Sequence, residues 1–219
     1  MCRTILTLLP IIGLVGSNNL STAIIILGIA VTLIFVASPR YAQFIWMAVS
    51  GVGFLGIFLA LESYRLERLA IWRNPEKYEK GYQTLQGLYA IGSGGMFGRG
   101  LGNSVQKLGF LPEAQNDMIF SIVCEELGLV GAGTIIVLFL ILIWRFFVIA
   151  THAPDLFGAL IAVGAMAHMM IQVILNIAVV TNSIPNTGIT LPFISYGGTS
   201  VVFLLLEMGL VLSISRLVQ

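Results

Sequence analysis

Long stretches without a charged residue constrain this chain more than any other feature. Residues 4–39, 41–61, 127–144 and 156–206 contain no Asp, Glu, Lys or Arg. A helix that crosses the hydrocarbon core of a bilayer needs about 20 apolar residues. Because lipid offers no hydrogen bonds to the backbone, segments of this kind have to be helices. The sequence therefore predicts an all-α, polytopic membrane helix bundle.

The first and the last of these stretches are too long for one span, and both contain polar breaks. "GSNN" at 16–19 divides the first, and "TNSIPNTGITLPFISYGG" at 181–198 divides the last. We therefore expect about six transmembrane helices within a single integral membrane domain over 1–219, with a large extracytoplasmic loop over 62–117. The predicted spans are 4–16, 20–38, 42–61, 118–146, 157–180 and 198–215.

The composition excludes several other classes of protein. Hydrophobic residues make up 58% of the chain and charged residues 10%, whereas soluble domains carry about 25% charged residues. The net charge of +1 gives no reason to expect nucleic acid as a partner. Cys2 and Cys124 are too few for a disulfide framework, and no His/Cys cluster indicates a zinc site. No nucleotide-binding glycine motif follows a predicted strand.

The orientation in the membrane follows from basic residues at the ends of the predicted spans. By alternation, Arg3, Arg40, Arg145 and Arg216 fall on one side of the bilayer. Short cytoplasmic loops carry an excess of Lys and Arg. We therefore expect this side, with the C-terminus, to be cytoplasmic, and the 62–117 loop to lie outside.

The outer loop begins with a segment that has helical spacing of its apolar residues. Leu66, Leu69 and Trp72 recur at this spacing, with arginines around them. Such a pattern is typical of a helix that lies in the membrane interface. A solvated helix connected to the third span fits the pattern as well.

Glycine dominates the middle of the outer loop. Six of the eleven residues at 92–102 are glycine. One interpretation is a tight loop that needs positive φ angles. The other is a nest of backbone N–H groups that holds phosphate oxygens beside Arg99 and Lys107. Composition alone does not separate the two.

Carboxylates gather where the fourth predicted span begins. "FLPEAQNDMIFSIVCEELGLVG" at 110–131 contains Glu113, Asp117, Glu125 and Glu126. Asp117 could cap the helix. Glu125 lies eight residues later, on nearly the same helical face and about 12 Å deeper, and an acid inside a span is a functional hypothesis by default. A buried polar network between helices is the structural alternative for Glu125 and Glu126.

At this point the motifs resemble those of a known family. "AIGSGG", "QKLGFLPEAQNDMIF", "EELGLVG" and "PNTGITLPFISYGG" occur in the order found in the SEDS proteins of shape, elongation, division and sporulation (FtsW, RodA and SpoVE). The resemblance covers nearly the whole chain. "SNNLSTA" at 17–23 departs from the family's usual signature at Ser17 and Asn19. SEDS proteins have about ten spans, so this chain corresponds to their last six and we expect a fragment or a short member.

The resemblance implies a peptidoglycan glycosyltransferase that polymerises lipid II at the outer face of the bacterial plasma membrane, in division, elongation or sporulation. It also implies a class B penicillin-binding protein and other divisome or elongasome membrane proteins as partners. The family's essential acid corresponds to Asp117.

The chemistry of this reaction suggests roles for further residues. A sugar hydroxyl that attacks an anomeric carbon needs a general base, and Asp117 is our candidate. The pyrophosphate leaving group needs cations or N–H donors, and a divalent cation (Mg²⁺ or Mn²⁺) could share this task. The predicted substrate-binding residues are Arg99, Gln106, Lys107, Glu113 and Glu125.

Two other residues and two other functions complete the predictions. We expect Ser195 to shape the last outer loop, and His168 to be an interhelical residue in the middle of a span. A lipid II flippase and a non-catalytic membrane scaffold for a penicillin-binding protein are the alternative functions.

Overall fold

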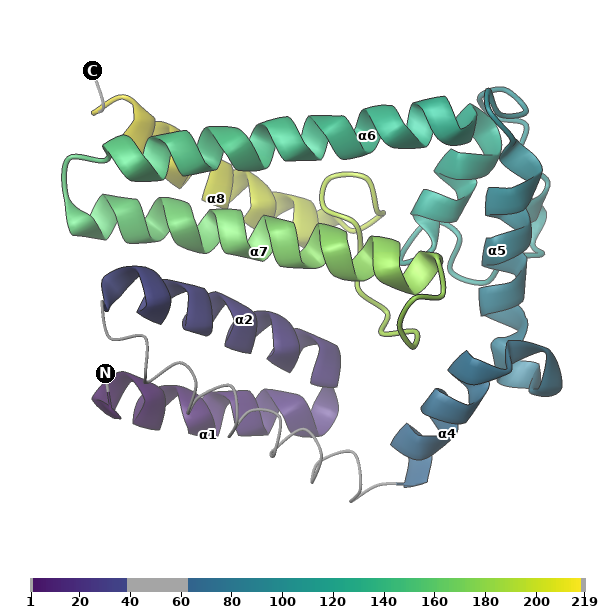
Figure 1. The fold of residues 1–219 in the computed structure, drawn as a ribbon, viewed down its shortest axis with the longest axis horizontal. Coiled ribbons are helices and arrows are strands. Elements are labelled where there is room, and N and C mark those ends of the chain that lie inside the picture. The colour runs from purple at the N-terminus through teal and green to yellow at the C-terminus, as the bar shows by residue number, and fades with distance from the viewer. Residues whose placement is uncertain (1, 39–62, 218–219) are drawn as a thin grey trace. The chain divides into compact units, whose positions relative to one another are not determined.

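The computed structural model describes residues 2–38 and 63–217, and every regular element in these ranges is a helix (Figure 1). The predicted all-α fold class is therefore confirmed. The predicted span 42–61 and Arg40 lie outside the described residues. The α-helices are α1 (Cys2–Asn18), α2 (Leu20–Ala37), α4 (Ser63–Arg73), α5 (Tyr82–Gly94), α6 (Ile119–His152), α7 (Leu156–Val180) and α8 (Gly198–Ser215). Short 3₁₀ helices are η1 (Pro75–Lys77), η2 (Glu79–Gly81) and η3 (Gln106–Leu108).

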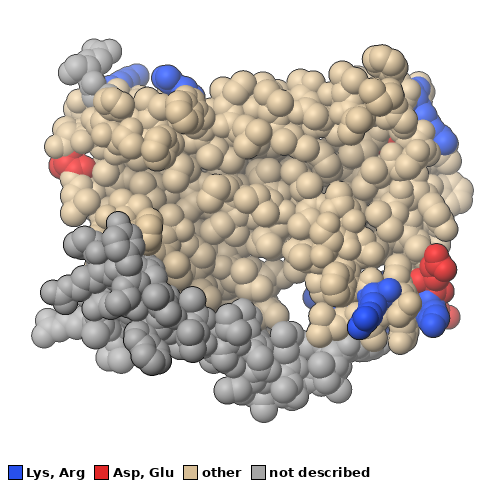
Figure 2. Space-filling model, viewed as in Figure 1, with Lys and Arg blue, Asp and Glu red and all other residues tan. Residues whose placement is uncertain are grey.

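Four of these helices, α2, α6, α7 and α8, are long and apolar enough to cross a membrane. They coincide with four of the predicted spans. The predicted span 4–16 falls within α1, which has 17 residues and contains Pro10. Among the described residues on the face shown in Figure 2, charged side chains occupy only small patches.

Two of the helices begin at polar residues that cap them. Asn19 Oδ1 accepts a hydrogen bond of 3.2 Å from Thr22 N at the start of α2. Asp155 Oδ1 accepts one of 2.8 Å from Gly158 N at the start of α7. A side-chain oxygen at this position satisfies a backbone N–H that the first turn leaves free. Asn19 departs from the family signature, and it can still act as a cap.

The described chain forms two compact units. The first contains residues 1–39, 138–174 and 197–219. In it α1 packs against α2, and the last part of α6 turns at residues 153–155 into α7, which runs antiparallel to it (Figure 1). His168 Nδ1 on α7 lies 2.8 Å from Glu207 Oε1 on α8. The predicted interhelical role of His168 is therefore confirmed.

The second unit contains the described residues 63–137 and 175–196. In it α6 is broken at Gly128 (φ 66°, ψ −167°). The glycine-rich segment fits against this break, because Leu129 N donates to Gly95 O (2.9 Å) and Val130 N donates to Met96 O (3.1 Å). A Cβ at Gly98 would lie 2.1 Å from Glu126 O. Glycine is therefore needed where the two backbones meet.

The break divides α6 into parts with different surroundings. At 1.5 Å per residue, the part after Gly128 is about 36 Å long, so it can cross a hydrocarbon core of about 30 Å by itself. The part before the break carries the buried Ser121, Glu125 and Glu126. The prediction of one continuous span over 118–146 did not anticipate this division, since the break depends on contacts with residues 95–98.

Candidate active site

Asp117 lies in a turn that precedes α6. Residues 111–118 form bends and turns, and the helix begins at Ile119. Asp117 is 7% exposed and its neighbour Met118 is 1% exposed. Glu113, in the same turn, has a left-handed backbone with φ 54°. The sequence predicted a helix from residue 118 with Asp117 as a possible cap, whereas in the structure Asp117 lies in a turn and the helix begins at Ile119.

A cavity of about 320 Å³ adjoins Asp117. Its walls come from α4, η2, α5, the turn that contains Asp117 and the loop that follows α7, all within the second unit. Its lining residues are Arg68, Ile71, Trp72, Lys80, Gln83, Thr84, Glu113, Asp117, Asn182, Asn186, Thr187 and Gly188.

The surroundings of Asp117 raise the pKa of its carboxyl group. Burial raises its pKa above the ordinary value of 3.8, and the charge of Glu113 adds to this. The N–H groups of Asp117 and Met118 and the side chain of Gln83 act in the opposite direction and lower the pKa. Its Oδ1 atom is buried and has no hydrogen-bond partner among the described residues. A buried carboxyl of this kind is a candidate general base, because its raised pKa makes its charged form a stronger proton acceptor.

Hydrogen bonds across the cavity connect the loop after α7 to α4 and α5. Trp72 Nε1 donates to Asn182 O (2.9 Å), and Arg68 Nη1 donates to Asn186 O (3.2 Å). Asn186 Nδ2 donates to Gln83 Oε1 (3.1 Å). These bonds bring together residues more than 100 positions apart in the sequence, so the cavity is a product of tertiary structure.

The predicted substrate-binding residue Glu113 shares this cavity with Asp117. The cavity also contains two cationic residues that sequence reasoning did not select, Arg68 and Lys80. Arg68 had a signal, because it belongs to the helical segment interpreted as an interface helix. Lys80 had none beyond its charge.

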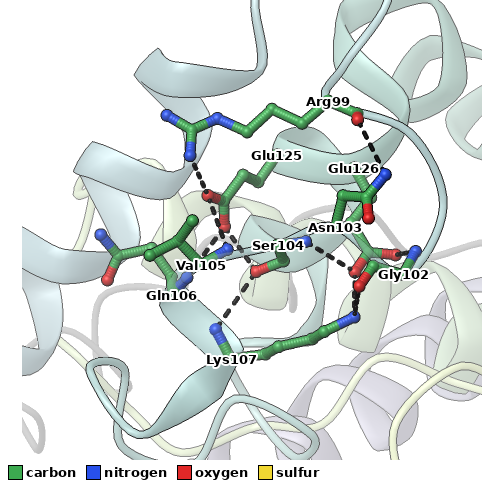
Figure 3. A network of polar contacts seen from close by, with 9 residues as sticks. All are labelled: Arg99, Gly102, Asn103, Ser104, Val105, Gln106, Lys107, Glu125 and Glu126. Carbon is green, nitrogen blue, oxygen red and sulfur yellow. Dashed lines mark hydrogen bonds and ion pairs between the residues drawn. The ribbon is translucent and has the colours of Figure 1, made fainter.

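The other predicted residues meet in a separate network around Glu125 (Figure 3). This carboxylate is 1% exposed. It accepts hydrogen bonds from Ser104 Oγ (2.5 Å), Val105 N (3.2 Å) and Gln106 N (3.3 Å). Arg99 Nη1 lies 3.3 Å from its Oε1 atom.

Glu126 binds the neighbouring residues of the loop at 99–107 (Figure 3). It accepts hydrogen bonds from Gly102 N (2.9 Å) and Ser104 N (3.2 Å). Lys107 Nζ lies 2.6 Å from its Oε1 atom and donates to Gly102 O (2.6 Å). Within the glycine-rich stretch, Gly102 N therefore binds a carboxylate, and the N–H groups of residues 98–100 donate to backbone carbonyls. These contacts within the protein favour the tight-loop interpretation of the glycines.

Arg99, Gln106, Lys107 and Glu125 thus lie together, and their mutual contacts hold the loop at 99–107. Their role as substrate-binding residues stays a prediction. Lys107 also lines a second cavity of about 680 Å³ with Leu108, Leu111, Glu113 and others. Glu113 is the residue that lines both cavities.

The described residues do not assemble a metal centre of their own. Within 2–38 and 63–217, no three Asp, Glu, His or Cys side chains come together as ligands. Glu113 and Asp117 share a cavity with the cations Arg68 and Lys80. Mg²⁺ is usually bound by one or two carboxylates together with phosphate groups of the substrate, so a divalent cation at Glu113 and Asp117 stays a prediction.

Comparison with known proteins decides the family. The sequence profile of the cell cycle proteins FtsW, RodA and SpoVE matches residues 1–219. This chain belongs to that family. The SEDS resemblance predicted from the motifs is therefore confirmed, and the chain is a multi-pass membrane protein.

Individual relatives extend this finding. The chain is 46% identical over 201 residues to stage V sporulation protein E of Bacillus subtilis. The aligned region covers 90% of this chain and 55% of the relative. It is 41% identical over 202 residues to a probable peptidoglycan glycosyltransferase FtsW of Coxiella burnetii, covering 90% and 54%. The chain thus spans about half the length of these relatives.

Solved structures show the same fold. A chain from a structure described as "Structural coordination of polymerization and crosslinking by a peptidoglycan synthase complex" superposes with a TM-score of 0.77 at 26% identity, covering 97% of this chain and 60% of that chain. RodA of Thermus thermophilus superposes with a TM-score of 0.64 at 27% identity, covering 99% and 56%. The described helices therefore share the helical fold of these membrane proteins.

Proposed function

We propose that this chain carries the catalytic centre of a peptidoglycan glycosyltransferase that polymerises lipid II, with Asp117 as general base. The observation that carries the proposal is the Asp117 carboxyl group, which is buried, has an oxygen without a hydrogen-bond partner among the described residues and lines a polar cavity. The names of the FtsW relatives support the same activity.

The reaction requires one proton transfer and one bond exchange. The 4-hydroxyl of the acceptor sugar attacks the anomeric carbon of the donor sugar, and Asp117 accepts the hydroxyl proton. The new C–O bond forms as the bond to the lipid pyrophosphate breaks, and the pyrophosphate leaves with the electron pair. An α-linked donor gives a β-linked product by inversion, so no covalent intermediate is needed.

The residues around Asp117 suit the two partners of this reaction. Arg68 and Lys80 line the cavity and can neutralise the charge that develops on the pyrophosphate. Amide side chains of Gln83, Asn182 and Asn186 can donate to and accept from sugar hydroxyls. Any Mg²⁺ or Mn²⁺ would enter with the pyrophosphate, and no step of the proposal depends on it.

The proposal includes the place and the partners of the reaction. We place the Asp117 cavity at the outer face of the bacterial plasma membrane and the C-terminus in the cytoplasm. Arg145 lies in the C-terminal part of α6 and Arg216 directly follows α8, and basic residues at the ends of spans mark the cytoplasmic side. We propose a class B penicillin-binding protein as the partner that crosslinks the glycan strands, within the divisome or the elongasome.

The test is polymerisation of purified lipid II by this chain in lipid nanodiscs, alone and with a class B penicillin-binding protein whose transpeptidase site is blocked. Asp117→Asn is the matched variant, because it keeps the shape of the side chain and removes its basicity. Glu79→Gln, an exposed carboxylate outside the cavity, is the control. We expect glycan strands from the parent and from the control, and a loss of at least about 100-fold with Asp117→Asn.

Other outcomes would favour the alternative functions. Translocation of a labelled lipid II without strands would favour a flippase. Stimulation of the penicillin-binding protein by the parent and by Asp117→Asn alike would favour a scaffold. Strands made equally by the parent and by Asp117→Asn would remove Asp117 from the mechanism.

A further inference from the structure

The turn that carries Asp117 has few hydrogen bonds of its own. Asn116 N and Met118 N donate to Glu113 O (3.0 and 3.4 Å), and Asn116 Nδ2 donates to the Glu113 carboxylate. The turn belongs to no helix or strand, so regular secondary structure does not fix the main chain of Asp117. Buried carbonyl groups in such a segment need partners from elsewhere.

Asn176 supplies the partner of the Asp117 carbonyl. Its side chain is 0% exposed, and its Nδ2 atom donates to Asp117 O (2.8 Å) and to Ile189 O (2.7 Å). Asn176 lies in the last turns of α7. One amide group therefore connects the backbone of Asp117 to α7 and to the loop that follows it.

The two preceding carbonyls are bound by the far end of the same loop. Ser195 Oγ donates to Asn116 O (2.7 Å) and accepts from Leu191 N (2.7 Å). Tyr196 N donates to Gln115 O (2.8 Å). Three consecutive carbonyl groups, at residues 115, 116 and 117, thus accept hydrogen bonds from residues 176–196.

We propose that Asn176 and Ser195 are positioning residues, which act through the backbone of Asp117 to hold its carboxyl group in the cavity. The proposal rests on the proposed function of Asp117 as base. The two side chains do not line the cavity themselves, so their contribution passes through the main chain. A displacement of about 1 Å at a reacting group lowers rates by about 100-fold. A turn without regular structure therefore needs the hydrogen bonds to its three carbonyls, which we call the clamp.

The experiment compares Ser195→Ala, Ser195→Thr, Asn176→Leu and Ser183→Ala in lipid nanodiscs by the polymerisation assay. Ser195→Ala removes the donor to Asn116 O, and Ser195→Thr keeps a hydroxyl. Ser183 is exposed, lies in the same loop and bonds to Thr181, so Ser183→Ala is the matched control. If Asn176→Leu fails to fold, the two Ser195 variants carry the test.

We expect Ser195→Ala to lower kcat by about tenfold to 100-fold, with KM within about twofold of the parent. Ser195→Thr and Ser183→Ala should keep most of the kcat of the parent. The acid limb of the pH–rate profile should also move to lower pH. A looser turn lets water reach Asp117, and burial is the main cause of its raised pKa. Glu113, Arg68 and Lys80, which line the same cavity, are unchanged in these variants.

Two results would overturn the proposal: a kcat and an acid limb equal to those of the parent in both Ser195→Ala and Asn176→Leu, or a lower yield of folded protein with the acid limb unmoved. A readout without turnover separates this proposal from the proposed function. A hydrophobic carbodiimide modifies protonated carboxyl groups, so its reaction with Asp117, followed by mass spectrometry against pH, reports the same shift. If the parent makes no strands, the proposed function fails, and an unchanged carbodiimide profile in Ser195→Ala then overturns the clamp as well.

Discussion

Lys107 Nζ lies 2.6 Å from Glu126 Oε1, and the same ammonium group donates to Gly102 O. This contact closes the loop at 99–107 over the first part of α6. With the neighbouring Glu125 it explains why two adjacent acids occur near the start of a predicted span. The two carboxylates accept hydrogen bonds from backbone N–H groups of this loop, and buried N–H groups need such partners.

Removal of the Glu125 carboxylate should unfold this loop. Glu125→Ala leaves Ser104 Oγ, the N–H groups of Val105 and Gln106 and the Arg99 guanidinium without their acceptor. Unsatisfied buried groups cost about 1–3 kcal/mol each, so we expect a loss of about 3 kcal/mol in the free energy of unfolding, measured by denaturation in mixed micelles. Glu79→Ala, at an exposed carboxylate, should stay within about 0.5 kcal/mol of the parent. Equal stability of the two variants would contradict the network.

Two glycines in the glycine-rich segment should respond to alanine in opposite directions. Gly98 has φ 76°, and a Cβ there would lie 2.1 Å from Glu126 O, so Gly98→Ala should cost about 4 kcal/mol or more. Gly92 lies within α5 with nothing within 4 Å of an added Cβ, so Gly92→Ala should stabilise the protein by about 0.5–1 kcal/mol. The melting temperatures of the two variants in detergent test this, and a stable Gly98→Ala protein would refute the close approach at the break in α6.

Asp117→Asn should leave the fold intact and change how stability depends on pH. A carboxyl whose pKa is raised on folding binds its proton more tightly in the folded state. Its contribution to stability is therefore lost as pH rises from the ordinary value of 3.8 through the folded-state pKa. Asparagine carries no charge, so the variant should be at least as stable as the parent at pH 7. The difference in stability between the variant and the parent should shrink in acid. Melting temperatures measured across pH test this, and a parent more stable than Asp117→Asn at pH 7 would contradict it.

The pair of His168 and Glu207 should show coupling between α7 and α8. Glu207→Leu leaves the imidazole without its partner at 2.8 Å, and His168→Leu leaves a carboxyl group in a membrane-spanning helix. Ionisable groups in spans are costly when unpaired. The losses in stability of the two single variants should therefore add up to more than the loss of the double variant His168→Leu/Glu207→Leu. A double-mutant cycle should give a coupling of about 0.5–3 kcal/mol, whereas additive effects would mean that the contact contributes nothing.

The sequence was sufficient for four membrane-spanning helices and for the family. The charge-free stretches predicted the positions of α2, α6, α7 and α8, because length and apolar composition are local properties that decide whether a segment can cross lipid. The order of the motifs predicted the FtsW/RodA/SpoVE family, which the match over 1–219 confirms. Asp117 and Glu113 were singled out from the same motifs, and the structure places both at one cavity.

Only the tertiary structure decided which side chains surround Asp117. Arg68 and Lys80 come from separate elements before the glycine-rich loop, and Asn182 and Asn186 follow α7. Arg99 and Lys107 lie nearer to Asp117 in the sequence, yet they pair with Glu125 and Glu126. A side chain forms its contacts in three dimensions, and the break at Gly128 that turns the glycine-rich loop onto α6 depends on backbone contacts between segments about 30 residues apart. No local pattern encodes such contacts, so the membrane-spanning helices α2, α6, α7 and α8 could be predicted from the sequence, and the composition of the cavity could not.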